Sequence, residues 1–512
     1  MEIIYDGKFK VNINGREIPF SEYYPAKKIE YEITKLVVKD GIKEIPDHLC
    51  KGFIKLKEVI FPKDLKIIGL GSFENCISLK QIDFPKNNFS IFSYAFEKCK
   101  SLYLVDLSNV DLIGSYAFSK CEKLNEIIFN DHPIIIQRAA FSSCNSLEEI
   151  KLPSNLKMME EYCFEHCTSL KSIKFSNSIN YIPERICYEC VSLKNVTIPK
   201  NIQKIKAAAF DNCTSLESIF LPDSIVEIGP HTFWNCKLLK EIKLPENLKL
   251  IDGCTFNHCK SLTQITIPDS VEKIEQSAFS NCTNLTEISI PDNVKKIGKE
   301  AFYKCESLEY IKLPNNLESI SLRMFYNCTN LKVIEIPNSV KIINGQAFYG
   351  CENLTTIKFP KNEYKIDITA FDKCKSLDNL TNYQIIMYCA SHVPQKNIQD
   401  LIDYLHIDTS DDSLIQELMS VNIGFYDHAN DCNREIFLEA ALDSIIEITK
   451  KGDSIYVIET EMCYIEYQKN NKTAELCNYE LNCYCPVRNL FYNDIIRQIV
   501  EKYEIENNIE NR

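Results

Sequence analysis

Cysteine is the residue whose type and spacing most strongly suggest chemistry in this chain. The chain contains 24 cysteines, and fourteen of them recur at an interval of 23 residues, with one interval of 22. A regular array of thiols could form disulfides, hold metal ions or carry redox chemistry. These fourteen, called the ladder cysteines below, are Cys76, Cys99, Cys121, Cys144, Cys167, Cys190, Cys213, Cys236, Cys259, Cys282, Cys305, Cys328, Cys351 and Cys374.

If each repeated unit forms one coil of a stacked array, neighbouring ladder sulfurs lie about 5 Å apart. Disulfide Cα geometry alone does not exclude bonds at that spacing, but all of these side chains would point the same way, into the core. A buried free cysteine behaves as a small apolar side chain with a weak S–H donor. We therefore expect a structural role for the ladder cysteines.

Other candidates for chemistry are few. Cys463, Cys477, Cys483 and Cys485 cluster near the end of the chain, but the paired spacing that is usual in zinc sites is absent. His166 and His258 occupy the same position of the unit, yet four coils separate them by roughly 19 Å, too far to share a ligand. No nucleophile elbow, phosphate-binding loop or zinc-protease motif is present. The sequence thus predicts no metal, no cofactor and no catalytic residue.

Aromatic residues at one position of the unit are the candidates for partner binding. A phenylalanine stands three residues before nearly every ladder cysteine and is expected in the core, whereas the next residue should be exposed. Exposed Tyr and Trp are favoured hot-spot residues, although such a row could also serve only to stabilise the array. The candidates are Tyr188, Trp234, Tyr303, Tyr326 and Tyr349, of which the last three occupy consecutive units and would stack.

The elements that hold these residues follow from the unit itself, of which residues 308–331 are a clear copy. Leu308, Ile311 and Leu313 have strand-like spacing, and Pro314 follows where a strand must end, because proline lacks an N–H. We expect a second short extended piece to come next, followed by a helical turn. In another copy, this turn would span residues 278–282. One unit cannot seal its own apolar faces, so the copies must stack into a solenoid. The one-residue deletion before Ile113 should leave a local irregularity.

The period defines three parts of the chain. We assign residues 1–32 to an N-terminal β cap, 33–381 to the solenoid and 382–512 to an acidic, helix-rich C-terminal domain or cap. The last part holds 10 Lys and Arg against 23 Asp and Glu, so it carries the whole net charge of −13. In it, residues 398–405, 413–419, 434–449 and 488–503 have helical patterns, whereas 455–467 has strand composition.

The repeated unit resembles the leucine-rich repeats of the BspA-like, treponemal type. The resemblance rests on Phe, Cys and Leu, which keep the same relative positions over fourteen copies. The resemblance covers about two thirds of the chain. It implies an α/β solenoid, a right-handed superhelix of about fifteen stacked repeats with parallel strands on one face. Known members bind proteins, and several are surface adhesins.

Composition narrows the function further. The chain shows no clustered Lys/Arg face for nucleic acid, no apolar run long enough to span a membrane and no secretory signal pattern. Twenty-four cysteines without such a signal favour reduced thiols and a cytoplasmic location. We expect a non-enzymatic scaffold that binds a protein partner through the solenoid surface. Two alternatives stay open: a cell-surface adhesin exported by a non-classical route, which binds a host or matrix protein, and an uncharacterised enzymatic C-terminal module that the repeats target.

Overall fold

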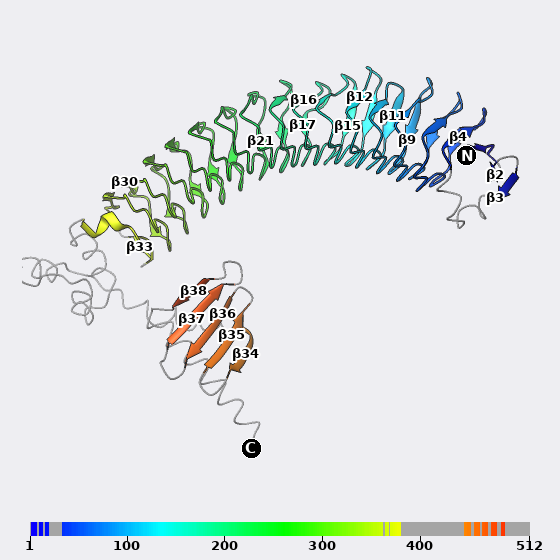
Figure 1. The fold of residues 1–512 in the computed structure, drawn as a ribbon. Helices are drawn as coiled ribbons and strands as arrows, with labels where there is room; N and C mark the ends of the chain where they lie inside the picture. Colours follow the sequence, from blue (N-terminus) through cyan, green and yellow to red (C-terminus); the bar gives the residue numbers. More distant parts are fainter. Residues whose placement is uncertain are drawn as a thin grey trace, which may run out of the picture. The chain divides into compact units, whose positions relative to one another are not determined.

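A computed structural model describes residues 2–19 and 33–379, with gaps at 8–9, 14–15, 362–363 and 368, and five strands between residues 445 and 486. The chain divides into two compact units, Met1–Tyr383 and Gln384–Arg512, and each is described by itself. The first unit is a parallel β-solenoid of about 14 turns, whose stacked coils form a long arc (Figure 1).

One side of each coil is a short strand that follows the ladder cysteine. Ile265, Ile288 and Ile311 pair in parallel register on three successive coils, and their side chains are buried. The exposed neighbours on either side give the alternation expected of a half-buried sheet. The strands of this row are β4 (Lys35–Val38), β6 (Glu58–Ile60), β8 (Gln81–Ile82), β10 (Leu104–Asp106), β12 (Glu126–Ile128), β14 (Glu149–Lys151), β16 (Ser172–Lys174), β18 (Asn195–Thr197), β20 (Ser218–Ile219), β22 (Glu241–Ile242), β24 (Gln264–Thr266), β26 (Glu287–Ser289), β28 (Tyr310–Lys312), β30 (Val333–Glu335) and β32 (Thr356–Lys358).

The second extended piece of the unit forms a second parallel row, as in the pairing of Ile251 with Ile274 and of Ile274 with Ile297. The predicted irregularity is present, because the register shifts between Val110 and Leu112, next to the deletion. The row contains β5 (Glu44–Ile45), β7 (Ile67–Ile68), β9 (Phe89–Ile91), β11 (Val110–Ile113), β13 (Ile134–Ile136), β15 (Leu156–Met159), β17 (Tyr181–Ile182), β19 (Lys204–Ile205), β21 (Glu227–Ile228), β23 (Leu250–Ile251), β25 (Lys273–Ile274), β27 (Lys296–Ile297), β29 (Ser319–Ile320), β31 (Ile342–Ile343) and β33 (Lys365–Ile366).

The third side of each coil is a run of tight turns, and the prediction of a helical turn here is wrong. In the coil that ends at Cys282, the amides of Phe279 and Asn281 donate to carbonyl oxygens of the next coil at 2.9 and 2.7 Å. Ser277 and Asn281 have φ of 53° and 59°, a left-handed conformation that interrupts any helix. Stacking prevails over local helix propensity because every second amide is needed to join the coils. We call this side the turn edge.

Phenylalanine and cysteine nevertheless point inward from the turn edge, as predicted. The ladder phenylalanines stack from coil to coil with ring centroids 4.9–5.9 Å apart. Cys187 interrupts the stack, and there the buried ring of Phe175 packs edge-on against Phe210 at 6.3 Å. The core is thus a continuous column of side chains that each coil shares with its neighbours.

Three short strands precede the first coil: β1 (Glu2–Tyr5), β2 (Lys10–Ile13) and β3 (Arg16–Pro19). They form an antiparallel ribbon, and β1 pairs in parallel with β4, so the ribbon extends the first row of strands. That residues 1–32 protect the first coil as a cap stays a prediction. At the other end of the solenoid, the 3-10 helix η1 (Lys375–Asn379) follows the last ladder cysteine.

The second unit is not helix-rich in the part that the structure describes, which corrects the prediction. It contains a five-stranded antiparallel meander of β34 (Ile445–Lys451), β35 (Ile455–Thr460), β36 (Cys463–Gln468), β37 (Thr473–Asn478) and β38 (Cys483–Pro486). Residues 445–449, assigned to a helix, lie in β34. The β-branched isoleucine and threonine side chains of this segment favour a strand once a partner is available. The strand composition of 455–467 is confirmed, and the other predicted helices lie outside the described residues.

Candidate interaction surface

The turn edge carries a regular row with one side chain from each coil, of which some are half-buried and others, such as Asp211, are buried. The residue two positions before each ladder cysteine stands between a buried phenylalanine and a residue whose φ is positive in nearly every coil. The amides of Asn281 and Lys304 donate to the carbonyl oxygens of Tyr303 and Tyr326 in the next coil, both at 2.7 Å. These bonds hold the backbone of the row in register. We call the residues at this position the edge row.

Tyr303, Tyr326 and Tyr349 stack in the edge row, as predicted. Their ring centroids lie 4.9 and 4.6 Å apart, with interplanar angles of 16° and 6°. Each side chain is half-buried rather than fully exposed, because a stacked neighbour covers at least one face of its ring. Burial and the adjacent tyrosines raise the pKa of Tyr326 to about 12, so its phenol stays neutral at physiological pH. We call these three residues the tyrosine strip.

Cations flank the tyrosine strip. The ammonium of Lys304 lies 5.3 Å from the ring centre of Tyr303, and that of Lys373 lies 5.1 Å from the ring centre of Tyr349. Cations within about 6 Å of an aromatic face are attracted to it. The strip therefore combines exposed aromatic edges with cationic groups.

Tyr188 and Trp234 lie apart from the tyrosine strip, so the five predicted residues form two groups. Tyr188 contacts His166 on the preceding coil, edge to face, with centroids 5.5 Å apart. Trp234 contacts His258 on the following coil in the same way, at 5.8 Å. Between them the edge row contains Asp211. Both aromatic side chains are half-buried.

Sequence reasoning missed a further aromatic group on the turn edge. Tyr94 and Tyr116, five residues before their ladder cysteines, stack with centroids 5.2 Å apart. The guanidinium of Arg138 lies 4.4 Å from the ring centre of Tyr162, and a hydrogen bond to Tyr116 helps to raise the pKa of Arg138. The recurrence of tyrosine at this second position of the unit was the signal that could have identified the group.

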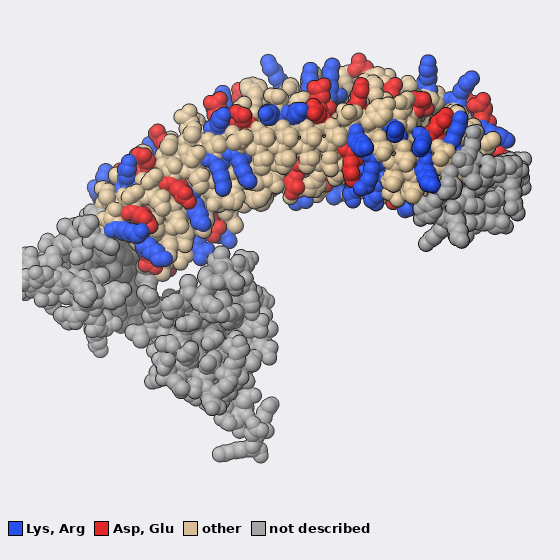
Figure 2. Space-filling view, in the orientation of Figure 1, with Lys and Arg blue, Asp and Glu red and all other residues tan. Residues whose placement is uncertain are grey.

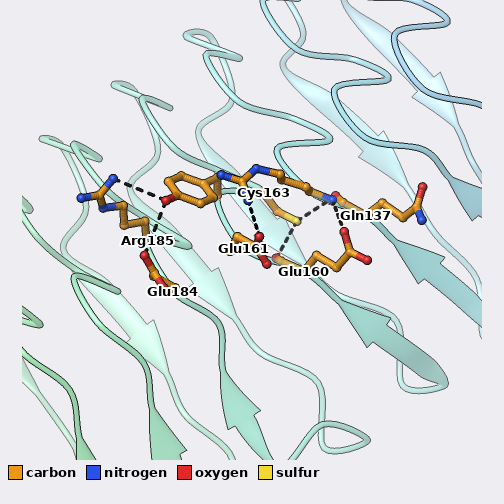
Figure 3. Close-up of polar contacts among 8 residues, drawn as sticks. Gln137, Glu160, Glu161, Cys163, Glu184 and Arg185 are labelled. Atoms are coloured by element: carbon orange, nitrogen blue, oxygen red, sulfur yellow. Dashed lines mark hydrogen bonds and ion pairs between the residues drawn. The ribbon is translucent and has the colours of Figure 1, made fainter.

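Polar contacts join the arginines of this group to Glu161 and to the hydroxyl of Tyr162 (Figure 3). Glu161 accepts a hydrogen bond from Arg138 at 2.5 Å. Arg185 donates to the hydroxyl of Tyr162 at 3.4 Å, and its guanidinium lies 5.5 Å from the ring centre of Tyr188. Arg185 therefore links this group to Tyr188 in the edge row.

The ladder cysteines are structural. Each thiol donates to a backbone carbonyl of the preceding coil, at Sγ–O distances of 3.1–3.4 Å, and in twelve of the fourteen coils that carbonyl belongs to the ladder phenylalanine. Burial raises the pKa of Cys99 to about 12 and raises that of Cys282 as well. A thiol with so high a pKa is a poor nucleophile and metal ligand at neutral pH.

Metal ligands do not gather in the described part of the chain, where no group of three or more His, Cys, Asp or Glu side chains could hold an ion. In the second unit, the strand register places Cys463 and Cys483 opposite Asn478, one on each side. That the four cysteines of this region hold no zinc stays a prediction. Among the described residues, no helix has both the length and the hydropathy of a membrane span.

Charged residues on the strand faces pair between coils. Lys332 contacts Glu309 at 2.7 Å and Lys240 contacts Glu217 at 2.8 Å, each across 23 residues. Such exposed pairs contribute little stability, typically about 0–1 kcal/mol, but they neutralise charge locally. On the face shown in Figure 2, basic and acidic side chains are accordingly intermingled.

Several solved structures similar to this one are leucine-rich repeat proteins of bacteria. A leucine-rich repeat protein from Bacteroides ovatus is 25% identical, with a TM-score of 0.47, over 73% of this chain and 85% of that chain. A leucine-rich cell surface protein from Faecalibacterium prausnitzii is 22% identical, with a TM-score of 0.37, over 73% and 86%. The leucine-rich repeat protein of T. pallidum is 28% identical, with a TM-score of 0.29, over 37% and 80%. No curated protein matches the chain.

The repeats themselves match a family. Residues 28–144, 104–217, 203–332 and 295–393 each match the family described as BspA type leucine-rich repeat region. Together these overlapping segments span well over half of the chain, and they contain every ladder cysteine. The chain therefore belongs to the BspA type leucine-rich repeat family.

Proposed function

We propose that this protein is a non-enzymatic scaffold that binds a protein partner through aromatic side chains on the turn edge of its solenoid. The observation that carries the proposal is the tyrosine strip, three half-buried rings in register at positions that the core does not require. Tyrosine supplies a large contact area at low entropic cost, which is why it is frequent in binding hot spots. Membership of a repeat family whose extended surfaces serve binding supports the same conclusion.

The test selects binders first and then asks where they bind. A random peptide library displayed on phage is panned against the full chain, and the selected peptides are titrated against the triple variant Tyr303→Ser, Tyr326→Ser, Tyr349→Ser. We expect binding to be lost while circular dichroism shows an intact solenoid. A matched control replaces by Ser the three exposed residues that directly precede strands β28, β30 and β32, which are Glu309, Lys332 and Thr355. Undiminished binding to the tyrosine variant would show that the strip serves only stability.

A cytoplasmic location is part of the proposal. The S–H···O=C bond made by each ladder cysteine requires a reduced thiol, and reduced thiols persist in a reducing compartment. The adhesin alternative places the same solenoid outside the cell. Cell fractionation combined with labelling of surface proteins distinguishes the two, because an adhesin would be labelled on intact cells. The alternative of an enzymatic C-terminal module has no candidate residues.

A further inference from the structure

The edge row contains one place where a carboxylate stands between two aromatic side chains, Tyr188, Asp211 and Trp234, on three consecutive coils. We propose that this triplet is the docking site for a lysine or arginine side chain of the protein partner. The inference rests on the proposed function and adds the chemistry of the partner to it.

The spacing of the coils suits a cation. Rings at the same position of adjacent coils are 4.6–4.9 Å apart in the tyrosine strip. Tyr188 and Trp234 are two coils apart, hence separated by about 10 Å. A cationic group midway between them would lie about 5 Å from each ring, which is within the range of about 6 Å for a cation–π contact. Asp211 belongs to the coil between the two rings.

The ring–ring contacts of both aromatic residues lie on their outer sides, and the guanidinium of Arg185 also lies 5.5 Å from the ring centre of Tyr188. Tyr188 contacts His166 on the coil before it, and Trp234 contacts His258 on the coil after it. These contacts support the two rings from outside the triplet. Both residues remain half-buried in spite of them, so each retains exposed area.

Asp211 carries a buried carboxylate oxygen without a hydrogen-bond partner among the described residues. Its side chain is only 7% exposed, and its Oδ1 has no hydrogen-bond partner. Burial is the main cause that raises the pKa of Asp211 to about 7, with an opposing effect of Arg185 and a smaller raising effect of Glu189. A buried polar atom without a partner is costly, so a cation that pairs with this carboxylate would recover free energy.

Hydrogen-bond acceptors beside the triplet suit an N–H donor. Next to Trp234 along the edge, Asn257 Oδ1 and His258 Nδ1 are buried without partners, and the amide oxygen can only accept hydrogen bonds. Burial and Arg185 lower the pKa of His231, so this histidine is neutral at physiological pH. An arriving N–H donor would therefore find a carboxylate and an amide oxygen on either side of the indole.

Trp234 is the only tryptophan of the chain, so its fluorescence reports on this site alone. The probes are short blocked peptides, Gly-Gly-Lys-Gly-Gly and Gly-Gly-Arg-Gly-Gly, titrated into the full chain at pH 8. We expect a saturable change in Trp emission with both peptides, and none with the same peptide carrying Nε-acetyl-lysine. In Asp211→Asn we expect the Kd to rise by about tenfold or more, as for loss of a charge-assisted bond.

Asp269→Asn is the matched control, because it removes an exposed carboxylate elsewhere on the solenoid and should leave the Kd unchanged. Equal binding of the charged and acetylated peptides, an unchanged Kd in Asp211→Asn, or no response of the unaltered protein would each overturn the proposal. The peptide comparison needs no variant, so it holds even if Asp211→Asn folds poorly. These outcomes are independent of the tyrosine strip, whose own test decides the scaffold function.

Discussion

Removal of one ring from the phenylalanine ladder tests whether the stacked core holds the solenoid together. Phe279 is fully buried, and its ring lies 5.5 Å from that of Phe256 and 5.6 Å from that of Phe302. Truncation of a buried phenylalanine to alanine typically costs about 3–5 kcal/mol. Phe279→Ala also ends two ring–ring contacts, each contributing about 0.5–1.5 kcal/mol within that total. We therefore expect a loss near the upper end of the range.

The chain offers a matched control for this substitution. Phe220 is 67% exposed directly after strand β20, so Phe220→Ala removes the same atoms from solvent rather than from the core. Substitutions at such positions usually change stability by no more than about 0.5 kcal/mol. The comparison between the two variants therefore isolates the effect of burial.

Urea unfolding, followed by circular dichroism, measures the free energy of unfolding of both variants. Hydrogen exchange shows which coils are destabilised. Because each coil contacts only its neighbours, exchange should rise most in the coils that contain Phe256, Phe279 and Phe302 and least near the first coils. Equal shifts for Phe279→Ala and Phe220→Ala would refute the claim that the ring column stabilises the fold. Uniform acceleration along the solenoid would refute the nearest-neighbour account.

Three further predictions follow from individual contacts. Gly298→Ala should lower the melting temperature, because the new Cβ would lie 2.5 Å from a backbone nitrogen of the preceding coil. Gly253→Ala should be tolerated, because the nearest atom to its new Cβ lies 3.6 Å away. Thermal melts compare the two variants. Mild alkylation with peptide mapping should label Cys254, the one half-exposed cysteine of the described solenoid coils, before Cys282, whose thiol is buried; equal labelling would contradict the buried ladder. The raised pKa of Asp211, about 7, means that the folded state binds its proton more tightly than the unfolded state, so this group lowers stability as the pH rises from about 4 to 7. Asp211→Asn should therefore raise the urea midpoint more at pH 8 than at pH 4. An equal effect at both pH values would count against a raised pKa of Asp211.

Much of the solenoid could be predicted because a repeated unit converts positions in the sequence into columns in space. Residues 23 apart, such as Tyr303 and Tyr326, necessarily project side by side once coils stack at the strand spacing. The inward placement of phenylalanine and cysteine followed from the same register. The helical turn was wrong because local pattern does not reveal that alternate amides bond the next coil.

The second unit shows the limits of local pattern more directly. Residues 445–449 satisfied a helical spacing of apolar side chains, yet they form β34, paired with β35 over the length of the strand. A strand is stabilised by a partner that lies elsewhere in the sequence, and a periodicity test within one segment cannot include that partner.

The sequence by itself determined the period, the stacked architecture and the family, because a unit that cannot seal its own apolar faces must repeat and stack. Only the tertiary structure decided that Asp211 is buried without a hydrogen-bond partner for Oδ1 and that Arg138 lies over Tyr162. Burial and ring contacts depend on what neighbouring coils place around a side chain. The spacing of residues along the chain does not specify those surroundings.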